Sequence, residues 1–505
     1  MIRGLILSAT FLLLAACGSA PLHKNRQALV VAIESSPTNL DPRLATDANS
    51  LRIIQLIFNG LMGYDADMRL KPELAEGYRI VNDTTYIFTI RRGVRFQHGR
   101  ELTAHDVKYT VESILDPKLK SPNFSTFERV KEVKVLGRYE ISFTLKEPFA
   151  PFLSALTIGI VPEELAEGPG FSRNPVGTGP FRLKGAPSPD KLILSANEDY
   201  FGGKPRLEEI IVKVVPDDTV RVMELMGGSV DLIINAIPPD MLPLLKRRGL
   251  EVHLSPGNSY SYLGFNLNDP ILRDRRVRSA IAYAIDREVI IRHLLKGTAQ
   301  PASGVLPPTS WAYEPDVPSY PYDPERARAL LDEAGYPDPP GPRPRFRLLY
   351  KTSQNELRRL IGEAMMAQLN EVGIDVEMRS YEWGTFFSDI KSGNFQIYTL
   401  TWVGIADPDV LYYIFHSENI PPRGANRGRY KNLEVDRLLT EARARLDIKE
   451  RRERYSQVQK ILAQDLPYVS LWYGINVAAA TRRVKGFHLN AAGDFMPLKE
   501  AWVEG

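Results

Sequence analysis

The sequence predicts an α/β protein with a parallel sheet in its C-terminal half. Strand-like and helix-like segments alternate between residues 345 and 402 at the spacing of right-handed crossovers, which place successive strands parallel in one sheet. The last strand-like segment, residues 395–402, is rich in aromatic and β-branched residues and leads to the helix start Asp407-Pro408-Asp409. Open α/β sheets bind ligands where a strand end meets a helix N-terminus, so this turn is the first candidate site.

Length and charge set the broad class of the protein. A chain of 505 residues is too long for one hydrophobic core, and its length predicts roughly three domains. The 64 Lys and Arg residues nearly balance the 61 Asp and Glu residues, which leaves a net charge of +3. We therefore expect no nucleic-acid partner, because nothing in this balance favours phosphate binding.

The first residues have the pattern of an export signal. Arg3 precedes an apolar run, residues 5–16, that is too short to span a bilayer. The run ends Leu14-Ala15-Ala16-Cys17, which resembles the bacterial lipobox, in which the cysteine becomes the lipidated first residue of the mature chain. We expect residues 1–16 to be a signal peptide, Cys17 to carry the lipid, and residues 17–27 to form a polar tether. An ordinary signal peptide with an incidental cysteine is the alternative.

Cys17 is the only cysteine of the chain. The mature protein is therefore expected to have no disulfide and no Cys-based metal site or nucleophile.

The N-terminal half combines a buried strand, a mixed α/β segment and further strands. Residues 28–33 are apolar throughout, and Ser50 begins a helix with an apolar face. Thr103 followed by Asp106 predicts a helix that starts with a capping box. The other predicted strands are 86–90, 139–145, 192–195, 210–215, 230–234, 250–254 and 260–266, with a helix at 219–226 that ends at Gly227.

The C-terminal half alternates between helices and strands. Asp323-Pro-Glu begins a helix that Gly335 ends. The predicted elements that follow are strand 346–350, helix 355–372, strand 374–378, a short helix near Phe386, strand 395–402, helices 433–447 and 449–465, and strand 468–473.

Motifs for catalysis and metal binding are missing from the sequence. It contains no Gly-x-Ser-x-Gly elbow, no His-Glu-x-x-His and no phosphate-binding loop. His98 and His105 are close in sequence but lack partners at metal-ligand spacing, which favours a loop and a surface position. We therefore expect no cofactor, no metal and no enzymatic activity.

Nine short motifs follow one another between about residue 28 and residue 473. They are Ser36-Pro-Thr-Asn-Leu-Asp-Pro42, Leu74-Ala-Glu-Gly-Tyr78, Leu102-Thr-Ala-His-Asp-Val107, Asn174-Pro-Val-Gly-Thr-Gly-Pro-Phe181, Arg276-Val-Arg-Ser-Ala-Ile-Ala-Tyr-Ala-Ile-Asp286, Tyr322-Asp-Pro-Glu, Glu333-Ala-Gly-Tyr, Tyr381-Glu-Trp383 and Asp407-Pro-Asp409. In this order they resemble the family 5 extracellular solute-binding proteins, the dipeptide-, oligopeptide- and nickel-binding components of ATP-driven importers.

The resemblance implies a type II periplasmic-binding-protein fold, with two main lobes, a central hinge and an extra mixed α/β lobe. Lobe I would take residues 28–55, 178–265 and 484–505. The extra lobe II would take residues 56–177, and lobe III residues 266–483. The hinge would lie near Val176 to Phe181 and near residues 265–270, and the lobes would close on a ligand.

The resemblance also implies a function. The protein would be a monomeric receptor, lipid-anchored to a bacterial membrane in the periplasm or cell envelope. It would capture a peptide or peptide-like solute and deliver it to the permease subunits of an ABC-type importer. A secreted hydrolase, a structural surface lipoprotein, and a binding protein for a sugar or a metal chelate are the alternatives.

The expected ligand residues come from both main lobes. They are Ser35, Ser36, Tyr260 and Tyr262 from lobe I, and Trp383, Trp402, Asp407 and Asp409 from lobe III.

One position departs from the family pattern. Peptide-binding members similar to this chain have an acidic residue three positions after the equivalent of Trp402, where it holds the amino end of the ligand. This chain has Ile405 there. Either Asp407 takes the role, with Asp409 as the second choice, or the ligand lacks a primary amine. From the residues alone, the two Asp can equally cap a helix while Trp402 fills a core.

Overall fold

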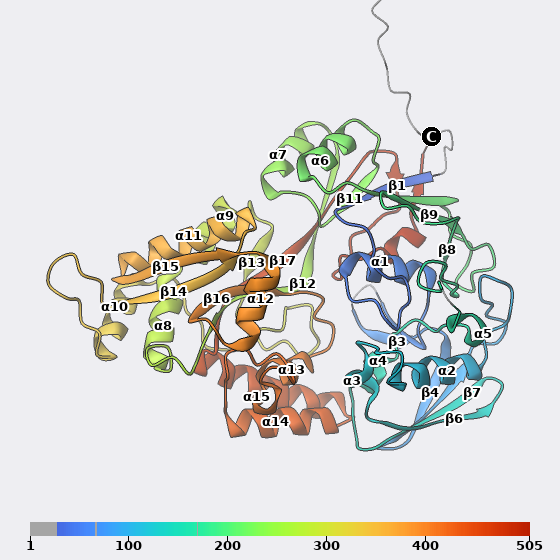
Figure 1. Cartoon of the computed structure of the whole chain (residues 1–505), viewed down its shortest axis with the longest axis horizontal. Helices are drawn as coiled ribbons and strands as arrows, with labels where there is room; N and C mark the ends of the chain where they lie inside the picture. Colours follow the sequence, from blue (N-terminus) through green and yellow to red (C-terminus); the bar gives the residue numbers. More distant parts are fainter. Residues whose placement is uncertain (1–27, 66–67, 169, 505) are drawn as a thin grey trace, which may run out of the picture.

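Buried apolar side chains divide the chain into three lobes, which Figure 1 shows at the upper right (lobe I), lower right (lobe II) and left (lobe III). The structure is a computed structural model that describes residues 28–65, 68–168 and 170–504. It confirms the predicted α/β class. The predicted signal peptide, Cys17 and the tether lie outside the described residues, and the lobe boundaries given above stay predictions.

Lobe I is built on the parallel strands β1 (Ala28–Ile33), β10 (Glu209–Val214) and β11 (Leu232–Ile234). All of β1 is buried, because α1 (Ala48–Ile57) packs on one face of the strand and α6 (Asp218–Met226) and α7 (Leu242–Arg247) pack on the other. Antiparallel strands β9 (Lys191–Ala196) and β8 (Phe181–Leu183) extend the sheet beyond β10. Asp47, rather than Ser50, caps α1 by accepting a hydrogen bond from the amide of Ser50.

Lobe II is a four-stranded antiparallel sheet in the order β4-β5-β7-β6, covered by α2. The predicted capping box at the start of α2 is present between Thr103 and Asp106. The elements of this lobe are β2 (Met62–Tyr64), β3 (Leu70–Pro72), β4 (Ala75–Asn82), β5 (Thr85–Ile90), α2 (Ala104–Leu115), α3 (Phe124–Phe127), β6 (Val130–Gly137), β7 (Glu140–Leu145), α4 (Phe152–Ala155) and α5 (Glu163–Ala166).

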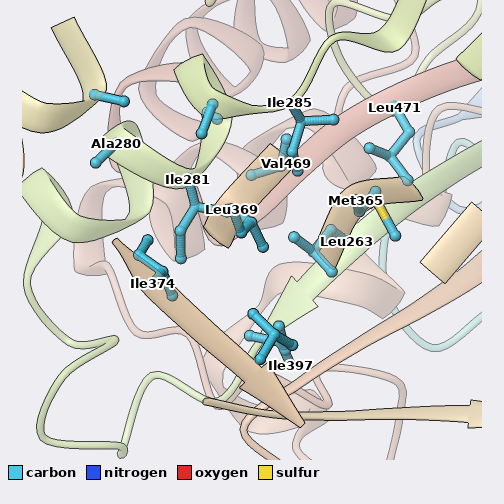
Figure 2. Packing of buried hydrophobic residues seen from close by; sticks show 14 of the residues in the cluster. Leu263, Ala280, Ile281, Ile285, Met365, Leu369, Ile374, Ile397, Val469 and Leu471 are labelled. Atoms are coloured by element: carbon cyan, nitrogen blue, oxygen red, sulfur yellow. The ribbon is translucent and has the colours of Figure 1, made fainter. Parts of the chain in front are cut away.

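Lobe III contains the predicted parallel strands, here β14 (Phe346–Ser353), β15 (Ile374–Tyr381) and β16 (Ile397–Trp402). Helices α8, α10 and α11 pack on one face of the sheet, where Leu263, Ile281, Met365, Ile397 and Val469 meet (Figure 2). Helices α12 to α15 pack on the other face. The remaining elements of this lobe are α8 (Arg275–Ala284), α9 (Arg287–His293), β13 (Ala299–Pro301), α10 (Pro324–Glu333), α11 (Glu356–Glu371), α12 (Trp383–Ser392), α13 (Val410–Phe415), η2 (Ser417–Asn419), α14 (Leu433–Ala444) and α15 (Ile448–Asp465).

Two long antiparallel strands, β12 (Glu251–Phe265) and β17 (Tyr468–Ala480), connect lobes I and III (Figure 1). Within the described residues they are central strands of one eleven-stranded sheet, with β11 on the lobe I side and β16 on the lobe III side. The prediction of two strands at 250–254 and 260–266 was wrong, because pairing with β17 continues through the register shift between Pro256 and Tyr260. Strand β17 likewise continues beyond residue 473. The short elements η1 (Pro239–Met241), β18 (Val484–Lys485), η3 (Met496–Lys499) and β19 (Trp502–Val503) complete lobe I.

The two connecting strands approach each other closely at Gly257. A Cβ atom placed on Gly257 would lie 2.7 Å from the carbonyl oxygen of Gly474. The close approach of the two backbones at this register shift therefore depends on the absence of a side chain at Gly257.

This close approach predicts that Gly257→Ala destabilises the protein by about 1–3 kcal/mol, because the added methyl group pushes the two backbones apart. The control is Gly77→Ala in β4, where a Cβ meets no atom within 4 Å. Calorimetric melting temperatures of the two variants measure the effect. An equal melting temperature for both would show that the crossing tolerates a wider separation.

Candidate functional site

The parallel strands of lobes I and III end at the same place, the crossing of β12 and β17. In lobe III, β16 runs antiparallel to β12, and its last residue Trp402 pairs with Tyr260, next to the crossing. In lobe I, β11 runs antiparallel to β17, and its last residue Ile234 pairs with Ala478. The carboxyl ends of the parallel strands of both lobes therefore point toward the space between the lobes, which is where α/β sheets bind ligands.

A cleft of about 600 Å³ lies at this place. Ser255 and Pro256 of β12 form its base, and Trp311 and Ile405 belong to lobe III. Lobe I contributes residues 488–491, and lobe II contributes Met68 and Arg69. All three lobes thus line one cleft, whose volume suits a small or medium ligand.

Aromatic rings and guanidinium groups form a wall at the carboxyl ends of β14, β15 and β16. Trp383 is 46% exposed and stacks on Phe387, with ring centroids 5.6 Å apart. The Arg427 guanidinium lies over the rings of both Phe387 and Trp402, at 5.3 and 4.7 Å, and the Arg358 guanidinium lies 5.0 Å from the Trp383 centroid. The structure thus brings together the two predicted tryptophans, Trp383 and Trp402, with two arginines that were not predicted.

These arginines have no carboxylate partner within the described residues. Arg427 donates to the hydroxyl of Tyr262 at 3.1 Å, and Arg358 donates to the hydroxyl of Ser353 at 3.3 Å. Burial lowers the pKa of Arg358. Two desolvated positive charges without counter-charges make this wall suited to an anionic group.

Sequence reasoning missed these arginines, although Arg358 has a recognisable signal. The neighbouring Arg359 has Glu363 one helical turn later and pairs with it at 3.5 Å, whereas Arg358 has no acidic residue three or four positions away. Arg358 could have been identified by this pattern: it is an arginine without an acidic partner, in the first turn of a helix that follows a strand.

Tyr260 and Tyr262 lie elsewhere than expected. They were predicted at a strand end on the lobe I side, but both lie within β12 and are 1% and 0% exposed. They pair with Trp402 and Leu400 of β16 and pack against Tyr468 and Tyr473 in the core of lobe III. The long continuous strand β12 is the reason, since it carries both residues past the crossing.

Ser35 and Ser36 follow the carboxyl end of β1, although neither residue lines the cleft of about 600 Å³. The carbonyl and hydroxyl oxygens of Ser35 accept hydrogen bonds from Asn49, both at 3.0 Å, and the Ser36 hydroxyl donates to the carbonyl of Pro189. The preceding residue, Glu34, has a buried Oε2 atom with no hydrogen-bond partner within the described residues. Glu34 is therefore a carboxylate after the carboxyl end of β1 with one oxygen that the described part of the protein leaves unsatisfied.

Both carboxylate oxygens of Asp407 accept hydrogen bonds from groups of the protein. Its Oδ2 accepts a hydrogen bond from Ser154 of lobe II at 2.8 Å, and its Oδ1 accepts from the Asp409 amide at 2.8 Å and lies 3.5 Å from Arg451. The helix cap was predicted at Asp407, but α13 begins after Asp409, whose side chain makes no capping hydrogen bond. Asp407 thus closes the turn before the helix and contacts lobe II.

Asp409 is buried against Arg443 in the same interface. Its Oδ1 lies 2.8 Å from Nε of Arg443, but the two groups are not aligned for a hydrogen bond. Burial outweighs the attraction of the arginine and raises the pKa of Asp409 to about 7. The ring of Tyr412 and the ring of Phe149 from lobe II cover Arg443. Asp407 and Asp409 therefore belong to a charged contact between lobes II and III.

The family model described as bacterial extracellular solute-binding proteins, family 5 middle, matches residues 69–421. The oligopeptide-binding protein AppA of Bacillus subtilis is 31% identical over 498 residues, covering 94% of this chain and 91% of that protein. The glutathione-binding protein GsiB of Salmonella typhimurium is 31% identical over 474 residues, covering 91% of each chain. The structure of AppA in complex with a nonapeptide superposes with a TM-score of 0.79 at 30% identity, covering 95% of this chain and 99% of that one.

The raised pKa of Asp409 predicts a specific pH dependence of stability. A carboxyl group whose pKa is higher in the folded than in the unfolded state stabilises the fold below about pH 4 and loses that contribution as the pH rises through about 7. Asp409→Asn removes this dependence. The free energy of unfolding of the variant should therefore rise relative to wild type between pH 4.5 and 8, by on the order of a few kcal/mol.

Urea unfolding at several pH values measures this difference. If wild type instead gained stability relative to the variant over this range, Asp409 would be an ordinary ion-paired aspartate with a lowered pKa.

Proposed function

Because the chain belongs to the family 5 bacterial extracellular solute-binding proteins, we propose that it is the receptor of an ABC-type importer and captures a peptide or peptide-like solute. The fold is the periplasmic-binding-protein fold of that family, and the protein is a solute-binding protein rather than an enzyme. The peptide ligand is the proposal. It rests on two relatives of comparable length, an oligopeptide-binding and a glutathione-binding protein, and on the chemistry of the proposed site.

The observation that carries the proposal is the meeting of two sets of strand ends at one cleft. The carboxyl ends of the parallel strands of lobes I and III face the same space, and the cleft there measures about 600 Å³. A ligand held by both edges would link the two lobes, and it would favour the arrangement in which they are closed.

The wall of lobe III would hold the carboxylate end of the ligand. Arg358 and Arg427 are positive, lack carboxylate partners within the described residues, and lie against Trp383 and Trp402. Arginine binds carboxylates through two parallel hydrogen bonds, and the indole rings offer apolar surface to neighbouring side chains. Trp383 and Trp402 therefore stay in the proposed site.

The amino end requires a negative charge, for which Glu34 is the better candidate. Asp407 already contacts Ser154 and Arg451, so an ammonium group would have to displace existing partners. Glu34 follows the carboxyl end of β1 in lobe I and has an oxygen without a hydrogen-bond partner within the described residues. We therefore assign the amino end to Glu34, near Ser35 and Ser36, and assign Asp407 and Asp409 to the contact between lobes II and III.

Lipid anchoring at Cys17, monomeric behaviour and delivery to a permease complete the proposal. No helix in the described part of the chain has the length and apolar character needed to cross a membrane. The lipobox-like Leu14-Ala15-Ala16-Cys17 supports an anchor in the cell envelope, with residues 17–27 as the tether.

Arg358 is expected to bind the C-terminal carboxylate of the peptide. Arg358→Gln should weaken binding of a peptide with a free C-terminus by tenfold or more, roughly 1.4 kcal/mol or above, because the carboxylate loses its counter-charge. Binding of the same peptide with a C-terminal amide should stay unchanged. Isothermal titration calorimetry measures both, and Arg359→Gln is the control, since that side chain pairs with Glu363. If the variant lost affinity equally for the peptide with a free C-terminus and for its amide, Arg358 would not bind the carboxylate of the ligand.

Two variants distinguish the roles of Glu34 and Asp407. Glu34→Gln should weaken binding of peptides with a free amino end and leave N-acetylated peptides unaffected. Asp407→Asn should leave affinity unchanged and lower stability by about 1 kcal/mol, because it weakens the hydrogen bonds of the turn. Titration of both peptide forms to both variants decides the assignment. The reverse pattern would make Asp407 the ligand anchor.

The proposed lipid anchor at Cys17 can be tested by substitution. Cys17→Ser should move the protein from the membrane fraction to the soluble fraction of the envelope, because the lipid-bearing thiol is lost. Fractionation of cells expressing each form measures this. Membrane association that persists in the variant would exclude lipidation at Cys17.

A further inference from the structure

A second cavity lies inside lobe III and is separate from the interlobe cleft. Its volume is about 510 Å³, and it shares no lining residue with the cleft. The segment of residues 285–322 forms one side, and helices α13 and α15 form the other. Most of the wall is apolar or aromatic, including Tyr320, Leu411, Phe415 and Leu462.

Arg287 is the positively charged group within this wall. Its Nε donates to the carbonyl of Ser470 at 2.7 Å, and its Nη1 donates to the carbonyls of Ala282, Ile285 and Tyr320 at 3.0–3.2 Å. Its Nη2 has no acceptor within the described residues, and no carboxylate lies within ion-pair distance there. Burial lowers the pKa of Arg287 to about 10.

The carbonyl groups orient this guanidinium without neutralising it. Four hydrogen bonds hold Nε and Nη1 in place and leave Nη2 as a fixed donor in an apolar wall. A buried positive charge is costly unless it is paired, so a bound anion would relieve the cost. A guanidinium group with one nitrogen free to donate is well suited to bind a single carboxylate oxygen.

We propose that this cavity is a second ligand site that binds a small monocarboxylate with an apolar or aromatic body. The volume fits a ligand of that size. Asp286 and Glu288 also line the cavity, and Asp286 caps α9 by accepting from the Val289 amide at 3.0 Å. The negative charges of Asp286 and Glu288 repel an anion that carries several charges. We therefore expect Arg287 to select a ligand with one carboxylate group.

Gly304 offers a way to close the cavity without disturbing the fold. It lines the cavity, and a Cβ placed on it meets no atom within 4 Å. Gly304→Leu should therefore fill part of the space at little cost in stability. Gly77→Leu is the matched control, because its Cβ also meets nothing within 4 Å but lies in lobe II.

The test uses 4-phenylbutanoate as the probe, with 4-phenylbutanamide and 4-phenylbutylamine as neutral and cationic analogues of the same body. Binding to the mature protein is measured by calorimetry and by saturation-transfer NMR. The carboxylate is expected to bind at least about tenfold more tightly than either analogue. Gly304→Leu is expected to reduce its binding at least about tenfold while keeping the melting temperature, and Gly77→Leu to leave it unchanged.

The cleft variant Arg358→Gln separates this site from the proposed peptide site. It should bind 4-phenylbutanoate as wild type does, whether or not peptides bind. Arg287→Met, if it folds, should abolish the preference for the carboxylate. The proposal is overturned if the three probes bind equally, if none binds, if Gly304→Leu binds as wild type does, or if Arg358→Gln alone removes binding.

Discussion

The pairing of β12 with β17 is the interaction on which the architecture depends. These strands are hydrogen-bonded from Glu251 and Ala480 in lobe I to Gly264 and Tyr468 in lobe III, across the register shift at the crossing. Each lobe adds its own parallel strands to this pair, β11 and β1 on one side and β16 and β14 on the other. Because both sets run antiparallel to the strand that they join, their carboxyl ends meet at the crossing. The position of the cleft therefore follows from strand direction alone.

The distribution of charge around the crossing follows a simple division. At the contact between lobes II and III, Asp407 and Asp409 lie near Arg451 and Arg443, although burial still raises the pKa of Asp409. Near the carboxyl ends of the parallel strands, Glu34, Arg358 and Arg427 have no oppositely charged partner within the described residues. A buried charge with an oppositely charged neighbour in the protein costs less than an unpaired one, whose cost a bound ligand can relieve. The same reasoning distinguishes Arg287 in the cavity of lobe III from structural arginines such as Arg345, which pairs with Asp332.

Local sequence signals predicted the elements whose stability is local. The apolar β1, the Thr103–Asp106 capping box and the parallel strands between 346 and 402 all follow from periodicity and capping chemistry. The continuity of β12 could not be predicted, because Pro256-Gly257 has the pattern of a break and only the distant β17 overrides it. The partners of Asp407 are likewise distant in sequence, at Ser154 and Arg451. Of the predicted site, Trp383 and Trp402 both contribute to the wall, Ser35 and Ser36 follow β1 in lobe I, and the two tyrosines are in the core.

We propose that the protein holds one peptide in the cleft between lobes I and III. Native mass spectrometry after incubation with a defined mixture of short peptides tests it most directly, comparing wild type with Ser255→Trp, which places a bulky side chain at the base of the cleft. We expect one peptide bound per wild-type chain and none bound to the variant. Equal peptide retention by the two proteins, or no retention by wild type, would contradict it.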